Sequence, residues 1–210
     1  MDRYSSYLEL QQFEREGRDY RIHVREGLSD IAVMAPHGGG IEPGTYEIAD
    51  AVAGCEHYFY CFEGIKKSHN TRLHLTSTSF DEDRGVRIAD SVQVVVAIHG
   101  SSETEEVVYL GGLQTSLKQQ IRARLTDAGF VVKESPRTAL QGRNPANICN
   151  RGASGAGVQL EISQGLRQKL FVPTENDGGK STNRLFDDFV SALRKALGTR
   201  SEHIQHRTLE

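Results

Sequence analysis

The sequence predicts a layered α/β fold whose sheet is largely parallel or mixed. Segments with the two-residue alternation of strands are interleaved with segments that show the apolar period of helices. Two of them, 31–35 and 93–98, are apolar runs of the kind found in central strands covered on both faces. The length of 210 residues suits one catalytic domain over 1–210 with a single core.

The first half of the chain is expected to alternate helices and strands. Leu8, Leu10 and Phe13 supply the apolar side of a short amphipathic helix near the N-terminus. Pro43 near its first turn and Gly54 after its end bound a second helix. In chain order we expect a helix at 5–16, strands at 20–24 and 31–35, a glycine-rich turn at 36–40, a helix at 43–53, and strands at 58–62 and 72–76.

The second half is dominated by two longer amphipathic helices. Apolar side chains recur every four residues from Leu113 to Leu125 and again from Leu185 to Leu197, and a glycine ends each pattern. A polar tail over 199–210 follows a core expected over about 20–197. In chain order we expect a helix at 84–91, strands at 93–98 and 107–110, a helix at 113–129, strands at 130–133 and 158–162, and a helix at 185–197.

Composition excludes several classes of protein. Hydrophobic residues make up 37% and charged residues 25%, and no apolar stretch approaches the roughly 18–20 residues that span a membrane. A net charge of −3 gives no case for nucleic-acid binding, and three cysteines do not make a disulfide framework. The N-terminal segment is polar, so we expect synthesis in the cytoplasm without a signal peptide. No coiled-coil pattern is present, and we expect a monomer.

Two strand-ending histidines and one carboxylate form the strongest candidate site. His37 closes the first apolar run and His99 closes the second, and a glycine follows each. Glu42 comes five residues after His37, across three glycines that let the backbone fold tightly. Ligands of α/β sheets bind beyond the carboxyl ends of central strands, so neighbouring strands would bring these side chains together. Two histidines and one carboxylate leave an open position, as in a catalytic zinc site.

Other interpretations of these residues remain open at this point. A lone histidine at a strand end is usually a hydrogen-bonded polar residue rather than a ligand. The glycine turn after His37 would also suit phosphate, although neither a P-loop lysine nor a G-x-G-x-x-G motif accompanies it. His74, in a strand-like segment beside Arg72, is a reserve candidate for a ligand or a proton shuttle.

Glu161 is the candidate general base. It lies in an otherwise apolar segment, 158–162, where burial would raise the pKa of its carboxyl group toward a catalytically useful value. The alternative is a strand residue that simply faces solvent. The loop before this strand carries Arg143 and Arg151 among several asparagines, a composition suited to binding carboxylates.

Four short blocks occur together within a chain segment of roughly 20–197. They begin at His37, Ala97, Asn147 and Gly157, and they read His-Gly-Gly-Gly-Ile-Glu, Ala-Ile-His-Gly, Asn-Ile-Cys-Asn-Arg-Gly and Gly-Val-Gln-Leu-Glu. In this combination the chain resembles the bacteriophage poly-γ-glutamate hydrolase family. The resemblance implies a three-layer sandwich similar to the zinc carboxypeptidases, with a mixed, mostly parallel sheet flanked by helices.

The resemblance also implies roles for individual residues. One zinc ion would be held by His37, Glu42 and His99, and Glu161 would be the general base. The first two ligands depart from the carboxypeptidase pattern, because H-x-x-x-x-E replaces the usual H-x-x-E. The implied substrate is the polyanion poly-γ-glutamate. The enzyme would act on it outside the cell, after its release by host lysis.

We infer that basic groups line the substrate groove, with Arg72, Arg143, Arg151 and His74 as candidates. Two alternatives to this function are a zinc amidohydrolase acting on small N-acyl amino acids or cell-wall peptides, and a non-enzymatic phage replication accessory.

Overall fold

The computed structural model describes residues 2–173 and 180–198. Its strands are β1 (Tyr20–Arg25), β2 (Ile31–Gly39), β3 (Tyr58–Gly64), β4 (Val94–Ser101), β5 (Val108–Gly111), β6 (Val132–Lys133), β7 (Val158–Ser163), β8 (Phe171–Pro173) and β9 (Lys180–Thr182). Its α-helices are α1 (Tyr7–Leu10), α2 (Thr45–Ala53), α3 (Asp83–Ser91), α4 (Thr115–Asp127), α5 (Gln164–Leu170) and α6 (Arg184–Leu197). Short 3₁₀ turns cover Asn70–Leu73, Thr138–Leu140 and Ile148–Asn150.

Seven strands form one sheet in the order β1-β3-β2-β4-β7-β5-β6, and β8 pairs with β9 in a separate ribbon. The four central strands β3, β2, β4 and β7 are parallel to one another. β1 joins β3 antiparallel at one edge, and β5 joins β7 antiparallel toward the other. This architecture confirms the mixed, mostly parallel α/β fold expected from the sequence.

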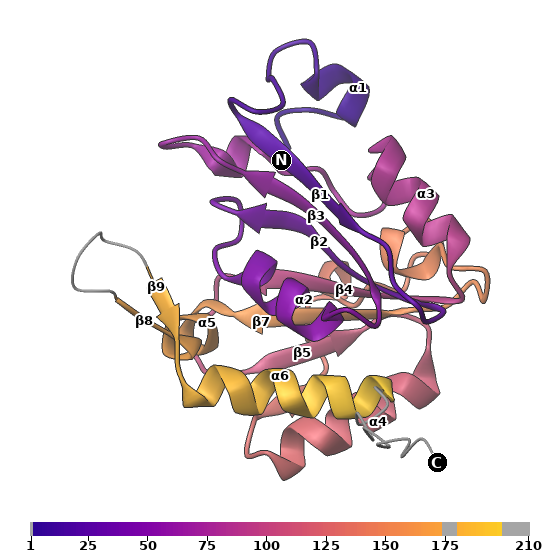
Figure 1. The fold of residues 1–210 in the computed structure, drawn as a ribbon, viewed down its shortest axis with the longest axis vertical. Coiled ribbons are helices and arrows are strands. Elements are labelled where there is room, and N and C mark those ends of the chain that lie inside the picture. The colour runs from indigo at the N-terminus through magenta and orange to yellow at the C-terminus, as the bar shows by residue number, and fades with distance from the viewer. Residues whose placement is uncertain (1, 174–179, 199–210) are drawn as a thin grey trace, which may run out of the picture.

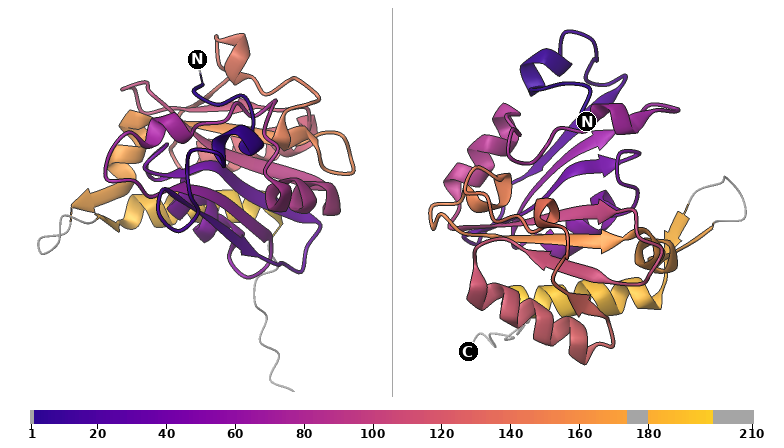
Figure 2. Two further views of the ribbon diagram at one scale, coloured as in Figure 1. Left: turned by 90° about the horizontal axis from the view of Figure 1, so that it is seen from above. Right: turned by 180° about the vertical axis from the view of Figure 1, so that it is seen from behind.

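The central strands are covered on both faces, as their apolar composition predicts. From β2, Val33 and Ala35 enter one core with residues of α2, α4, α5 and α6. Ala32 and Met34 point to the opposite face and pack with residues of α1 and α3. Figure 1 shows α2 and α6 over the first face, and Figure 2 shows the opposite face with α3 and the loops beside it. The fold therefore has three layers.

A bulge in β2 changes which face its last residues use. Ala35 pairs with Cys61 of β3, but the next pair joins Gly38 to Glu63, so β2 contains one extra residue. Pro36 lies in this interval, where its missing N–H costs no ladder hydrogen bond. A bulge shifts the alternation of side chains by one residue. His37 consequently lies on the α1 and α3 face, although simple alternation from Ala35 would place it on the other.

Three expectations about local structure are wrong or incomplete. The helix expected at 5–16 is only one turn, α1, because its buried face is formed by Tyr7 and Leu10 while Leu8 and Phe13 are exposed. The segment expected as a glycine-rich turn continues β2 to Gly39. The sequence patterns also gave no sign of α5, β8 or β9.

The strand expected at 72–76 is absent. Leu73 and Leu75 do alternate into the core, as the pattern suggested. Their backbone nevertheless belongs to a 3₁₀ turn and an irregular segment, and the Leu75 carbonyl contacts the His37 ring instead of a strand. The polar tail expected at 199–210 lies outside the described residues. Among the described helices, none has the length and apolar character that crossing a membrane requires.

Candidate metal centre and active site

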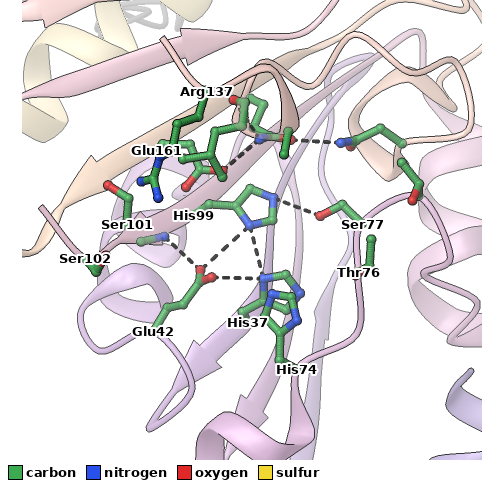
Figure 3. Close-up of a pocket in the computed structure, with 16 residues that line it drawn as sticks. His37, Glu42, His74, Thr76, Ser77, His99, Ser101, Ser102, Arg137 and Glu161 are labelled. Atoms are coloured by element: carbon green, nitrogen blue, oxygen red, sulfur yellow. Dashed lines mark hydrogen bonds and ion pairs between the residues drawn. The ribbon is translucent and has the colours of Figure 1, made fainter. Parts of the chain in front are cut away.

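The site lies at the carboxyl ends of β2, β4 and β7. His37 comes from β2, His99 from β4, and Glu42 from the loop between β2 and α2. They line a cavity of about 410 Å³ together with Glu161 of β7 and His74. Figure 3 shows the two histidine rings and the Glu42 carboxylate directed toward one another. The parallel pairing of β2 with β4 brings the predicted ligands together.

The distances among these three side chains fit a zinc site. Nδ1 of His37 lies 3.1 Å from Nδ1 of His99 and 3.2 Å from a carboxylate oxygen of Glu42. The other Glu42 oxygen lies 3.7 Å from Nδ1 of His99. Tetrahedral zinc, with bonds of about 2.0–2.2 Å, holds its ligand atoms roughly 3.3–3.6 Å apart. One ligand atom from each of the three residues lies within 4.8 Å of the other two, so the group is a candidate metal site, and three protein ligands would leave a fourth position open.

The proton position on His37 strengthens this conclusion. Its Nε2 lies 2.7 Å from the carbonyl oxygen of Leu75, which accepts hydrogen bonds and cannot donate them. Nε2 therefore carries a proton, and Nδ1 faces Glu42 and His99, where it presents a lone pair when the ring is neutral and donates to Glu42 when the ring is charged. A backbone carbonyl that fixes the tautomer of a histidine is a common second partner of metal-binding histidines.

Glu42 is ionised in this surrounding. Burial alone would raise its pKa, but the neighbouring charge of His37 and hydrogen bonds from His37 and His99 hold the pKa of Glu42 well below its usual range. The backbone N–H of Gly100 donates to Glu42 over 2.8 Å. Burial likewise opposes the charged form of His99, yet its hydrogen bond to Glu42 and the charge of Glu161 raise the pKa of His99.

The H-x-x-x-x-E spacing is accommodated by a closed loop. The backbone N–H of Glu42 donates to the carbonyl of His37 over 3.0 Å, so the chain returns to the strand end before α2 begins. Gly39, inside this loop, has a φ of +60° and so adopts the left-handed conformation that glycine tolerates best. A Cβ at Gly38 would lie 2.2 Å from the sulfur of Cys61. The glycines therefore let the loop close against β3.

Glu161 stands beside the three ligands. It is opposite His99 in the parallel register of β4 and β7, and its side chain is 5% exposed. Desolvation by this burial raises its pKa to about 7. The Gln159 side chain donates to one oxygen of Glu161 over 2.8 Å, and Asn147 donates to Gln159 over 2.9 Å. The carboxylate is therefore inward-facing and held in one orientation.

His74 lies against the first ligand rather than in the ligand set. Its ring stacks on that of His37, with 3.9 Å between the ring centres. Its Nδ1 lies 2.8 Å from a carboxylate oxygen of Asp2. Burial and the neighbouring His37 lower the pKa of His74 to about 4, which leaves the ring neutral near pH 7.

The arginines selected from the sequence lie outside the cavity. Arg143 is exposed and forms an ion pair with Glu134 over 3.6 Å. Arg151 is exposed and pairs with Asp90 in the last turn of α3 over 3.5 Å. Arg72 is exposed in the 3₁₀ turn Asn70–Leu73. None of these three described side chains lines the cavity that holds the ligands.

Two other arginines approach the site, and the sequence analysis did not single them out. Arg137 lines the cavity and donates to Glu103. Arg167, on α5, is buried and lines a second cavity of about 380 Å³ that shares Glu42 and Gly100 with the first. Arg137 belongs to a basic stretch of the sequence, but no spacing distinguishes it there. Arg167 belongs to the helix that the patterns did not reveal.

Sequence comparisons match most of the chain to known relatives. Residues 4–192 match the sequence profile of the family described as poly-gamma-glutamate hydrolase. The chain is 34% identical to the SPbeta prophage-derived UPF0714 protein YoqZ of Bacillus subtilis strain 168, over 93% of this chain and 72% of YoqZ. It is 36% identical to the UPF0714 protein YndL of the same organism, over 93% of this chain and 78% of YndL.

Solved structures agree with the sequence relatives. A bacteriophage poly-gamma-glutamate hydrolase superposes with a TM-score of 0.87 at 33% identity, covering 94% of this chain and 97% of that one. YndL in an apo, zinc-free form superposes with a TM-score of 0.88 at 32% identity, covering 95% and 98% of the two chains. The chain belongs to the poly-gamma-glutamate hydrolase family.

Proposed function

We propose that this protein is a zinc-dependent hydrolase that cleaves the γ-glutamyl amide bonds of poly-γ-glutamate. The observation that carries the proposal is the convergence of His37, Glu42 and His99 beside the buried carboxyl group of Glu161. Membership of the family supports the substrate. YndL is known in an apo form described as zinc-free, which supports zinc as the metal of this centre.

The metal centre would hold one ion through His37, Glu42 and His99. Nitrogen and oxygen donors of this kind suit zinc, and three protein ligands are typical of a catalytic site rather than a structural one. Bound there, zinc would polarise the scissile carbonyl and lower the pKa of a water molecule toward about 7. We also propose that the protein is a metallopeptidase similar to those of the carboxypeptidase type.

Glu161 would perform the proton transfers. As a carboxylate it accepts a proton from the attacking water, and as a carboxylic acid it returns that proton to the nitrogen of the departing amine. A carboxyl group whose pKa is about 7 serves both steps near neutral pH, because both of its protonation states are well populated there. The hydrogen bond from Gln159 leaves the other oxygen of Glu161 available for this exchange.

The substrate carries one free α-carboxylate on each residue, so the cavity needs a cation. Arg137 is the one lysine or arginine among the described residues that line the cavity. We therefore place a substrate carboxylate on Arg137 rather than on Arg72, Arg143 or Arg151. The neutral ring of His74 and the hydroxyl of Ser77 would supply further polar contacts. Release at host lysis would bring the enzyme to polymer outside the cell.

Incubation of the purified protein with poly-γ-glutamate tests this function. We expect the polymer to shorten, a chelator to stop the reaction, and added zinc to restore it. Sizing of the products on a gel-filtration column follows the reaction. A small N-acyl amino acid and a cell-wall peptide serve as control substrates, because a zinc amidohydrolase of different specificity would cleave them and leave the polymer intact. Intact polymer after zinc has been restored would contradict the proposal.

A further inference from the structure

Arg167 is a buried cation whose contacts converge on the segments that form the site. It lies on α5, and only 8% of its surface is exposed. Its guanidinium donates to three backbone carbonyls, those of Ile162 at 3.0 Å, Pro43 at 2.5 Å and Ser101 at 2.9 Å. Arginine suits such an arrangement because its donors diverge in fixed directions from a rigid plane.

Each accepting carbonyl is a close neighbour in the chain of a site residue. The three carbonyls lie one residue after Glu42, two residues after His99 and one residue after Glu161. A single side chain therefore joins the loop that supplies the carboxylate ligand, the strand that supplies a histidine and the strand that supplies the base.

The backbone alone does not make this connection. The ladder between β2 and β4 ends where Met34 pairs with Ala97, before either histidine is reached. Beyond that pair, and apart from contacts among the candidate ligands, hydrogen bonds of the described residues connect the Glu42 loop to β4 at two places. One is the hydrogen bond from Gly100 to the Glu42 carboxylate, and the other is the guanidinium of Arg167.

Gly100 provides the space that the guanidinium occupies. A Cβ at this position would lie 2.7 Å from Cζ of Arg167, closer than such atoms approach in proteins. The same residue donates its N–H to Glu42. Arg167 is therefore packed directly against the peptide that orients the carboxylate ligand.

We propose that Arg167 is a positioning residue that holds the Glu42 loop and the His99 strand at the separation that metal binding requires. The proposal rests on the proposed function, since it concerns the same zinc centre. Groups that orient metal ligands without touching the ion typically contribute 10- to 100-fold to metal affinity. A lysine at this position keeps the positive charge but cannot donate in three fixed directions, so Arg167→Lys separates geometry from charge.

Arg194 offers a matched control. Its guanidinium also donates to backbone carbonyls, those of Ala51 and Val52, and it also packs against a glycine, Gly54. It lies on α6 and lines neither cavity at the site. Arg194→Lys therefore alters contacts between a guanidinium and backbone carbonyls at a place where the candidate metal ligands are not involved.

The experiment measures zinc affinity by competition with a chromophoric chelator. We expect Arg167→Lys to bind zinc about 10- to 100-fold more weakly than the unchanged protein, and Arg194→Lys to stay within about twofold of it. The visible absorption of a Co²⁺-loaded sample should change in Arg167→Lys alone, since it reports the ligand geometry. Urea unfolding of the metal-free proteins measures the loss of stability separately. Equal zinc affinity in the unchanged protein and Arg167→Lys would overturn the proposal.

Gly100→Ala provides a second variant, which keeps Arg167 and the backbone N–H but pushes the guanidinium away. We expect its zinc affinity to fall as well; unchanged affinity would count against the proposal even if Arg167→Lys did not fold. Failure of the proposed function has a different signature. In that case the unchanged protein binds zinc and leaves poly-γ-glutamate intact, while the difference in affinity between the two lysine variants persists.

Discussion

Two carboxylates in this protein, the buried Glu82 and the partly buried Glu42, have opposite surroundings. Glu82, at the start of α3, accepts hydrogen bonds from the Tyr60 hydroxyl at 2.8 Å, the Gly85 backbone at 2.9 Å and the Arg84 guanidinium at 2.8 Å. Glu42 accepts one backbone hydrogen bond, and its other oxygen faces the Nδ1 atom of a neighbouring histidine.

The difference separates a structural carboxylate from a candidate metal ligand. The charge of Glu82 is balanced by fixed donors, which is the ordinary condition for a buried ionised group. Glu42 shares its space with His37 and His99, whose ring nitrogens have lone pairs when neutral. Only a cation, a proton or a metal ion, satisfies all three groups at once. A partly buried carboxylate that faces two histidine nitrogens is therefore suited to binding a metal ion together with them.

Replacement of His99 tests this comparison with the largest expected effect. His99→Ala removes one of three protein ligands, so we expect bound zinc to fall from one ion per chain to none after dialysis, and hydrolysis to fall to background. Metal analysis by atomic emission measures the first change. Retention of one zinc ion per chain in this variant would show that the centre is elsewhere.

Glu82→Ala is the contrasting change. It removes the cap of α3 and leaves the Tyr60 hydroxyl and the Gly85 N–H without their acceptor. We expect a loss of about 3 kcal/mol in the free energy of unfolding, with one zinc ion per chain retained. Urea unfolding measures the stability. A Glu82 variant that lost zinc while still folded would erase the distinction between the two carboxylates.

Replacement of Glu161 sharpens the comparison, because this buried carboxyl group accepts a hydrogen bond from Gln159 but lacks the three donors that surround Glu82. In Glu161→Gln the hydrogen bond to Gln159 can persist, but the side chain no longer accepts a proton. We expect turnover to fall about 100- to 10,000-fold while zinc remains bound. The control is Glu63→Gln. It removes a carboxylate of β3 that pairs with His23 of β1, and it should keep nearly full activity. Near-normal turnover in Glu161→Gln would exclude its role as base.

The convergence of His37 and His99 was predictable because it depends on strand ends. His37 and His99 each close an apolar run, and parallel neighbouring strands place such ends at one edge of a sheet. The position of His37 on the correct face was not predictable, since it depends on the bulge in β2. Pro36 hints at an irregularity, but a proline alone does not specify an extra residue or the direction of its neighbours.

The substrate-side residues were harder to predict because loops and single contacts leave no periodic pattern. Arg137, Arg143 and Arg151 belong to one basic stretch, and only the folded loop shows which of them lines the cavity. Arg167 acts through carbonyls from three distant segments, a relation that no local spacing encodes. The strand expected at 72–76 failed for a related reason. Its alternation reflects burial of Leu73 and Leu75 without any neighbouring strand to pair with.

A final prediction concerns the stability of the metal-free protein as pH changes. Burial raises the pKa of Glu161 to about 7, whereas the same group in the unfolded chain has a pKa near 4.5. The folded protein therefore holds this proton more tightly, and ionisation favours unfolding. Relative to Glu161→Gln, the unchanged protein should lose stability as pH rises from about 4.5 to about 7, and the loss should then level off.

The expected loss follows from the separation of the two pKa values. At about 1.4 kcal/mol per pH unit, it amounts to on the order of 3 kcal/mol. Urea unfolding of both proteins in a chelator, at intervals between pH 4.5 and pH 8, measures the difference at each pH. Other titrating groups are present in both proteins, so the difference isolates Glu161 and its interaction with His99. A constant difference across this range would mean that burial does not raise the pKa of Glu161, and it would contradict the prediction.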